Sequence, residues 1–223
     1  MSHYLDVVLP TRNRWGMLVK TVETLERGSY KDFRITLVLD EDHTPIPAWI
    51  GQHGIDTFVD TGGNTLVRQI GNCVSTLTGS LTLGCGDDAR FEPTCIETAV
   101  RVMKTYFPNR MGVVGLSQHI DGVPRGQQGV FAVYNKRFKN HFPDGNPYCP
   151  DYSHYHTDIE LWRYAQSIGR AYFCADAKVH HLRVQDETTA RVKTNLAYDA
   201  EMARRRKEKG YLWGKTFDLI GSP

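Results

Sequence analysis

Apolar positions along the chain follow two alternating patterns, which predict alternating strands and helices. Short apolar runs with the length of buried strands lie at 5–9, 35–39, 81–83 and 111–116. Between them, apolar residues recur every three or four positions, as on one face of a helix, around 18–25, 66–77 and 96–107. Pro10 is expected to end the first strand, and Gly28 and Gly79 to follow the first two helices. This alternation is typical of an α/β fold with a mixed, mainly parallel central sheet flanked by helices.

The second half of the chain has a weaker periodicity. It predicts strands at 129–134, 172–174 and 178–180 and a helix at 157–168. Thr94 and Thr157 each precede a glutamate by three positions, which is the pattern of a capping box at the start of a helix. The tail is polar and predicted to be helical, and no linker precedes it. We therefore expect an α/β domain over 1–185 and a basic, helical appendage over 186–223.

Composition narrows the class of protein. Of 223 residues, 40% are hydrophobic and 23% charged, as in globular proteins, and the net charge of +2 creates no overall field for nucleic acid or membranes. The mean hydropathy is −0.43, and no apolar run approaches the ~20 residues that span a bilayer, so no membrane insertion is expected. The five cysteines form no C-x-x-C pair, and the N-terminus lacks a signal-peptide pattern. These features predict a cytoplasmic location, which is the host cytoplasm if the chain is phage-encoded.

Three polar clusters directly follow three of the predicted strands. They are Pro-Thr-Arg-Asn-Arg at 10–14, Asp-Glu-Asp at 40–42 and Gly-Asp-Asp at 86–88. Ligands of open α/β sheets bind beyond the carboxyl ends of the strands, so the clusters are expected to share one crevice. For any one cluster alone, an ordinary polar loop is the preferred explanation. Together they favour a bound cation, because gathered carboxylates repel one another without one.

The acidic segment also matches a dinucleotide-binding pattern. Residues 84–89 fit G-x-G-x-x-A, but two aspartates there would repel the pyrophosphate that this motif holds. Carboxylate oxygens are instead good ligands for Mg²⁺ or Mn²⁺, and such a metal can bridge to phosphates. Asp87 and Asp88 therefore indicate a metal–diphosphate site, with a solvated turn as the alternative.

A second acidic residue is a candidate general base. Asp158 stands at the predicted start of a helix, where the helix dipole favours its ionised form. Helix capping is the alternative interpretation, and for Glu160 it is the preferred one. His180 and His181 close a predicted strand and are candidate metal ligands, although a lone histidine is more often structural.

Taken in order, these motifs resemble the family 2 glycosyltransferases of the GT-A fold, an inverting group that uses nucleotide-sugar donors. The matching segments are the strand and P-T-x-N-R turn at 7–14, the second strand and its acidic ending at 37–44, the helix with Arg68 and Asn72, the D-x-D-type segment at 86–93, the E-D-x-E-L…R…G-type helix at 157–169, and a late histidine, His180 or His181. The chain departs from the family in having Gly-Asp-Asp for D-x-D and Thr157 for the usual glutamate. The Q-x-x-R-W motif of processive synthases is absent, which favours a single transfer.

The resemblance implies a role for each matching residue. Those expected to bind the donor nucleotide, with a UDP-sugar as the first choice, are Pro10, Thr11, Arg12, Asp40, Arg68 and Asp87. Those expected to hold Mn²⁺ or Mg²⁺ are Asp88, with Asp87 as second choice, and His180 or His181. Asp158 is expected to accept the proton of the acceptor hydroxyl.

Two other function classes and the acceptor stay open at this stage. A binding module with the same fold would bind a nucleotide sugar without turnover, and a metal-dependent hydrolase would use His154, His156 and Asp158, together with His180. The run 203–209 carries five positive residues and one negative residue. A solvated helix face is its more ordinary explanation. The sharper hypothesis is a polyanionic acceptor, such as DNA with a hydroxylated base of the kind that phage glycosyltransferases modify.

Overall fold

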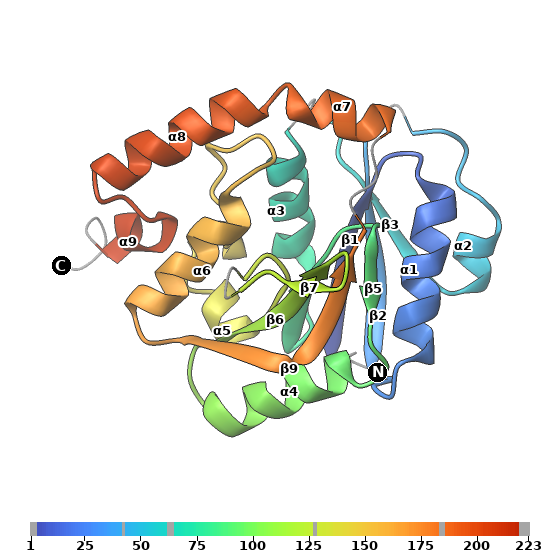
Figure 1. The fold of residues 1–223 in the computed structure, drawn as a ribbon, viewed down its shortest axis with the longest axis horizontal. Helices are drawn as coiled ribbons and strands as arrows, with labels where there is room; N and C mark the ends of the chain where they lie inside the picture. Colours follow the sequence, from blue (N-terminus) through green and yellow to red (C-terminus); the bar gives the residue numbers. More distant parts are fainter. Residues whose placement is uncertain (1–3, 42, 62–64, 127–128, 183–185, 219–223) are drawn as a thin grey trace.

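One mixed β-sheet with helices on both faces organises the molecule (Figure 1). The computed structural model describes residues 4–41, 43–61, 65–126, 129–182 and 186–218. The strands are β1 (Leu5–Thr11), β2 (Phe33–Leu39), β3 (Asp56–Val59), β4 (Leu81–Gly84), β5 (Ala89–Phe91), β6 (Val113–Ile120), β7 (Val123–Pro124), β8 (Ala132–Asn135) and β9 (Ala171–His181). Their order in the sheet is β3-β2-β1-β4-β8-β6-β9-β5, with β7 beside β6. The predicted α/β class is confirmed.

The first half of the chain forms the parallel part of the sheet. β1 runs parallel to β2 and β4, and β2 runs parallel to β3. β8 then lies antiparallel between β4 and β6, while β9 is parallel to β6 and β5 closes the sheet antiparallel to β9. The carboxyl ends of β1, β2 and β4 therefore lie at the same edge of the sheet.

Apolar faces of the helices cover both sides of this sheet. The helices are α1 (Trp15–Arg27), α2 (Trp49–Gln52), α3 (Leu66–Thr76), α4 (Cys95–Tyr106), α5 (Lys136–Lys139), α6 (Thr157–Ser167), α7 (Glu187–Lys193), α8 (Leu196–Glu208) and α9 (Trp213–Asp218). One core cluster contains buried residues of α1, α2 and α4, and the other contains those of α3, α5 and α6. Within β1, Val7 and Leu9 belong to the first cluster and Val8 to the second, as alternation along a strand requires.

Two predicted strand boundaries were wrong. β1 continues through Pro10, which lies opposite Val38 of β2. β4 pairs with β1 only as far as Val8, so the end of β1 has a neighbour on one side, where a residue without an N–H is tolerated. The two short strands expected at 172–180 are one long strand, β9, with an irregularity in its pairing between Leu116 and Ser117 of β6.

Neither predicted capping box forms. Thr94 is the N-cap of α4 but its side chain makes no capping hydrogen bond, and Glu97 accepts a hydrogen bond from the hydroxyl of Ser29 instead. In α6 the N-cap is His156, at a left-handed φ of 70°, and Thr157 is already inside the helix. A local sequence pattern thus predicted both helices but not how their first turns are capped.

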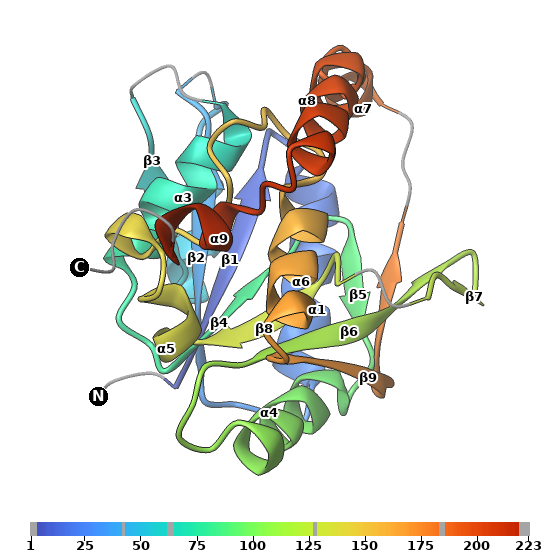
Figure 2. The same ribbon diagram turned by 90° about the vertical axis from the view of Figure 1, so that its left-hand side faces the viewer.

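The helical tail packs across the carboxyl edge of the parallel strands. Figure 2 shows β1 pointing towards the end of the molecule at which α7 and α8 lie. The described part of the tail, 186–218, contains α7, α8 and α9. It contacts Arg14, which follows β1, and His154, which precedes α6. Within the described ranges, no helix is long and apolar enough to cross a membrane.

Candidate functional site

The three polar clusters that follow β1, β2 and β4 meet at the carboxyl edge of the sheet. Thr11 donates a hydrogen bond of 2.7 Å to the carboxylate of Asp87, linking the ends of β1 and β4. Arg12 donates a hydrogen bond of 2.7 Å to Asp40, linking the ends of β1 and β2. These two hydrogen bonds bring the three clusters together at one edge of the sheet, where ligands of open α/β sheets bind.

Asp87 is the buried centre of this arrangement. Its carboxylate accepts the Thr11 hydroxyl and also lies 3.2 Å from Nη1 of Arg14. Burial raises the pKa of Asp87 to about 6, and these two partners act against that rise. Both oxygens of Asp87 therefore accept hydrogen bonds within the protein. These bonds suit a residue that holds the strand ends in position around a ligand.

Asp88 projects in another direction and meets one of the two candidate histidines. Its Oδ2 lies 3.2 Å from Nε2 of His181, and Nδ1 of that ring lies 2.6 Å from the amide nitrogen of Gln118. His180 turns to the opposite face of β9, where its Nε2 lies 3.4 Å from Glu92, because successive side chains of a strand alternate. Of the two histidines considered as metal ligands, only His181 lies beside Asp88.

The Asp88–His181 pair fits a divalent metal that is held together with a substrate. A carboxylate oxygen and an imidazole nitrogen stand side by side, and both are groups that bind divalent metals in proteins. Among the described residues, no three His, Cys, Asp or Glu side chains gather as a complete protein metal site. Mg²⁺-type cations commonly combine one or two protein ligands with substrate phosphates and water, so two ligands agree with such a site.

Asp158 lies in the first turn of α6, within electrostatic reach of His181. Its Oδ1 accepts a hydrogen bond of 2.9 Å from the backbone N–H of Ile159. Burial raises the pKa of Asp158 to about 6, while backbone hydrogen bonds and the nearby ring of His181 lower it. A carboxyl group with this pKa is ionised at neutral pH and can still take up a proton, as a general base must.

The hydrolase alternative required a metal held by His154, His156, Asp158 and His180. No such cluster forms in the described part of the chain, which disfavours this alternative. His154 has a different environment: burial lowers the pKa of its ring, and the charges of Asp88 and Arg14 act on it.

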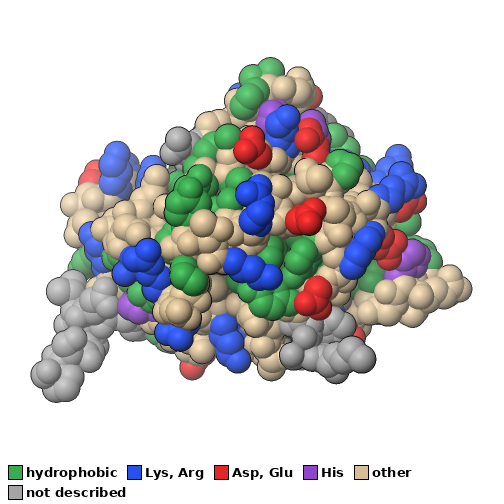
Figure 3. Space-filling view, turned by 90° about the horizontal axis from the view of Figure 1, so that it is seen from below, with side chains coloured by type: hydrophobic (Ala, Val, Ile, Leu, Met, Phe, Trp, Pro, Cys, Tyr) green, Lys and Arg blue, Asp and Glu red, His purple; other side chains and the backbone are tan. Residues whose placement is uncertain are grey.

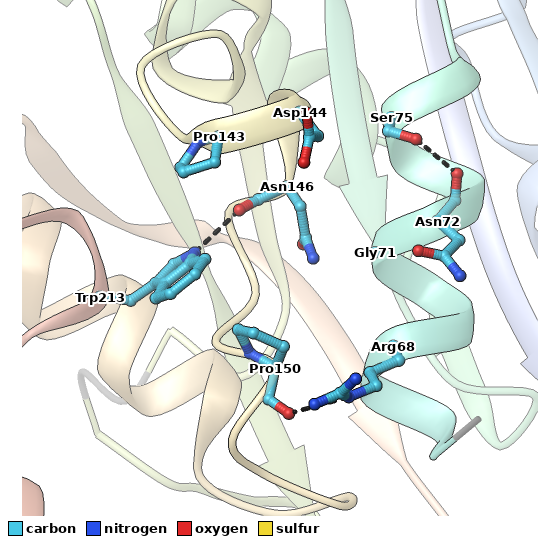
Figure 4. A pocket seen from close by; sticks show the side chains of 9 residues that line it. All are labelled: Arg68, Gly71, Asn72, Ser75, Pro143, Asp144, Asn146, Pro150 and Trp213. Atoms are coloured by element: carbon cyan, nitrogen blue, oxygen red, sulfur yellow. Dashed lines mark hydrogen bonds between the residues drawn. The ribbon is translucent and has the colours of Figure 1, made fainter. Parts of the chain in front are cut away.

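Arg68 lies apart from the crevice. It lines a surface pocket of about 370 Å³ between α3, the segment 143–150 and Trp213 (Figure 4). There its Nε donates a hydrogen bond of 3.3 Å to the backbone carbonyl of Pro150. Asn72, which also lines this pocket, donates to Asp60 at the end of β3. The structure thus does not bring Arg68 together with Thr11, Arg12 and Asp40, and Pro10 lies within β1 just before that group.

Sequence reasoning missed the contacts that the tail makes with this site. Arg14 forms two hydrogen bonds of 2.8 Å with Asp186, and it also donates to Thr189 of α7. These bonds lower the pKa of Asp186 to about 2. The position of Arg14 in the polar cluster after β1 was a signal of function, but nothing in the sequence indicated its partners 172 and 175 residues away.

Glu160 also has a partner in the tail rather than the expected capping role. Its carboxylate accepts hydrogen bonds from Nε and Nη2 of Arg206 in α8, the second at 2.7 Å. Tyr152 donates to it at 2.7 Å, and Nη1 of Arg206 reaches Asp151. Both Glu160 and Arg206 are buried, so this ion pair forms part of the contact between α8 and α6.

Structural comparison places the chain among solved glycosyltransferase folds. By sequence, no family model and no curated protein matches the chain. The mannosyltransferase PcManGT from Pyrobaculum calidifontis, in complex with GDP-Man and Mn²⁺, superposes with a TM-score of 0.68 and 14% identity over 91% of this chain and 64% of its own. Residues 1–349 of S. aureus TarS match with a TM-score of 0.63 in complex with UDP-GlcNAc, at 12% identity over 82% of this chain and 59% of that one. The corresponding complex with UDP gives a TM-score of 0.61 at 12% identity, over 80% and 60%.

The chain is shorter than these proteins and covers less than two thirds of each of them. At this level of identity the likeness concerns the fold, including the mixed sheet and its flanking helices. The protein therefore has the fold of these glycosyltransferases.

Proposed function

We propose that the protein is a metal-dependent glycosyltransferase that moves one sugar from a nucleoside diphosphate to an acceptor hydroxyl, with inversion at the anomeric carbon. The observation that carries this proposal is the set of polar side chains gathered at the carboxyl edge of the sheet. It combines the Thr11–Asp87 and Arg12–Asp40 links with the Asp88–His181 pair, and Asp158 of α6 lies within electrostatic range of His181. The similar solved structures are glycosyltransferases in complex with nucleotide sugars, and this likeness of fold supports the same activity.

Each part of the crevice has a role in this proposal. The segment with Pro10, Thr11 and Arg12 borders the nucleobase and ribose, and Asp40, oriented by Arg12, accepts hydrogen bonds from the base. Asp88 and His181 would hold Mn²⁺ or Mg²⁺ on the diphosphate, where a bound metal neutralises charge on the leaving group. UDP-sugars remain our first choice of donor.

Asp158 supplies the acid–base chemistry. Its ionised carboxylate takes the proton of the acceptor hydroxyl while that oxygen attacks the anomeric carbon on the side opposite the diphosphate. The new bond forms as the bond to the leaving diphosphate breaks, which inverts the configuration. Arg14 and Asp87, joined to each other in the crevice, hold the loops after β1 and β4 in place for this geometry.

The Asp88–His181 pair gives the first testable prediction. Asp88→Ala is expected to abolish metal-dependent binding of a nucleoside diphosphate, and His181→Ala to weaken it, because each removes one of two protein ligands. His180→Ala is the matched control: this histidine is the adjacent residue of β9 but faces Glu92, so binding should stay at the wild-type level. Calorimetry with UDP and GDP, with and without Mn²⁺, measures all three. Loss of binding in His180→Ala with retention in His181→Ala would reverse the assignment.

The activity itself is tested by ligand binding and donor turnover. A thermal-shift panel of nucleoside diphosphates with and without Mn²⁺ should show a shift that needs both ligands. Hydrolysis of the matching nucleotide sugar, followed by mass spectrometry of candidate acceptors, then separates a transferase from a non-catalytic binding module. Stabilisation without any turnover of the bound donor would favour the binding module.

The basic run of the tail, which motivated the DNA hypothesis, makes ion pairs within the protein. Arg204 pairs with Glu201 and Glu208, Arg205 pairs with Glu201, and Arg206 is buried against Glu160. Three of the five cations thus have carboxylate partners within the protein. On the face opposite α7 and α8, side chains of both charges are interspersed with apolar ones (Figure 3). These observations favour a glycan or small-molecule acceptor over the DNA hypothesis.

We therefore expect no salt-sensitive DNA binding through the tail. A salt titration of duplex and single-stranded DNA binding measures this, because each phosphate contact adds to the slope of log K against log salt. An Arg204→Ala/Arg205→Ala double variant, changed at exposed positions only, serves as the comparison. Strong binding that this variant loses would restore the DNA hypothesis.

A further inference from the structure

Asp199 of α8 is a fully buried carboxylate whose partners are all in one loop. Its relative exposure is 0%. Its oxygens accept backbone N–H groups of Ser153 at 2.7 Å, His154 at 2.9 Å and Tyr155 at 2.8 Å. Three successive backbone N–H groups that donate to one carboxylate make a strong anchor, because hydrogen bonds to a carboxylate are stronger than those to a neutral acceptor.

The anchored loop leads directly into the proposed general base. Residues 153–155 lie outside any helix or strand, so their backbone N–H groups have no ladder partners and depend on Asp199. The next residue, His156, takes a left-handed φ of 70° and starts α6, and Asp158 follows in its first turn. A displacement of this loop therefore moves the start of α6.

The same loop carries His154, a side chain within electrostatic range of the proposed metal–diphosphate site. The ring of His154 is partly buried and lies within the fields of Asp88 and Arg14. Its backbone N–H is one of the three that Asp199 holds. One carboxylate in the tail thus controls the loop between two parts of the crevice.

Contacts on either side of Asp199 keep α8 itself in place. Before it, Asp186 and Thr189 bind Arg14, next to the end of β1. After it, Arg206 binds Glu160 of α6. Beyond that, the indole N–H of Trp213 donates to the backbone carbonyl of Asn146 (Figure 4). The tail is therefore attached to Arg14 after β1, to α6 and to the segment between α5 and α6. Along the chain, Asp199 lies between these attachments.

We propose that Asp199 is a positioning residue for sugar transfer: it fixes the backbone of 153–155 and thereby sets Asp158 and His154 relative to the Asp88–His181 pair. The kinetic part of this inference rests on the proposed function, whereas the part that concerns the loop does not. If Asp199 has this role, the C-terminal segment is part of the active site and is not an accessory appendage.

The test compares Asp199→Asn with Glu201→Gln in the full chain. The asparagine keeps one oxygen but turns an NH₂ group towards the amide donors, whereas Glu201 is an exposed residue of the same helix that pairs with Arg204 and Arg205. In Asp199→Asn, hydrogen exchange of the 153–155 amides should accelerate at least ~10-fold. With the donor that the wild type uses, kcat should fall ~10–100-fold at a KM and a nucleotide affinity within about threefold. Glu201→Gln should match the wild type in every measurement.

The outcomes separate the two proposals. Unchanged exchange at 153–155, or accelerated exchange with an unchanged kcat, overturns the positioning role. A wild type that binds donor without turning it over overturns the proposed function instead. If Asp199→Asn does not fold, hydrogen exchange in the wild type provides the test. The backbone amides of 153–155 should then be protected although they lie in an irregular loop. Rapid exchange of these amides would contradict the proposed anchoring by Asp199.

Discussion

Asp158→Asn should bind the nucleotide-sugar donor normally and lose ~10²–10⁴-fold in the rate of transfer, which is the usual effect of removing a general base. The amide has nearly the same shape and can still accept the backbone N–H of Ile159, so α6 should begin as in the wild type. It cannot take up the proton of the acceptor hydroxyl. Single-turnover kinetics with donor binding measured in parallel separates these two properties.

The pH dependence of the same step gives a second measure of the role of Asp158. A general base acts in its ionised form, and burial raises the pKa of Asp158 to about 6. The rate should therefore fall as the pH is lowered through this value and level off above it, and the residual activity of Asp158→Asn should lack this decline. Near-normal transfer by the variant would instead make Asp158 a helix cap and leave the base unidentified.

Arg206→Ala should destabilise the protein by about 3–5 kcal/mol, the range found when one member of a buried ion pair is removed. The substitution leaves Glu160 buried, with the Tyr152 hydroxyl and the Trp213 N–H as remaining donors but no cation. It also frees Asp151 and loosens the contact of α8 with α6. The free energy of unfolding from urea denaturation, with the m-value compared between variants, measures this loss.

Arg204→Ala is the matched control for Arg206→Ala. Arg204 lies two residues earlier on the same helix and pairs with Glu201 and Glu208 at the exposed surface. Exposed pairs of this kind contribute little to stability, so the variant should unfold at nearly the wild-type urea concentration. Equal destabilisation by the two substitutions would show that the helix propensity or charge of the run matters, and not the buried pair.

The sequence by itself determined the longer strands and helices, the parallel first half of the sheet and the edge at which the polar clusters meet, whereas α2, β3 and β5 were not predicted. Apolar periodicity reports which face of each element is buried, and that is a local property of the chain. The ligand edge then follows from topology, because parallel strands put the residues after β1, β2 and β4 side by side. Thr11, Arg12, Asp40 and Asp87 were found in this way.

Only the tertiary structure decided which of these side chains work together. The strand that carries both His180 and His181 was visible in the sequence, but not that His181 alone would face Asp88, since that depends on the register of β9 with β5. The partners of Glu160 and of the 153–155 loop come from α8, about 45 residues further along. From sequence, a charged residue in a polar tail is expected to be exposed to solvent. In the fold, Arg206 instead meets the buried carboxylate of Glu160, and Asp199 meets the backbone amides of 153–155. Long-range electrostatic pairing leaves no periodic signal, so the structural role of Asp199 and Arg206 emerged only from the packing of the tail on the sheet.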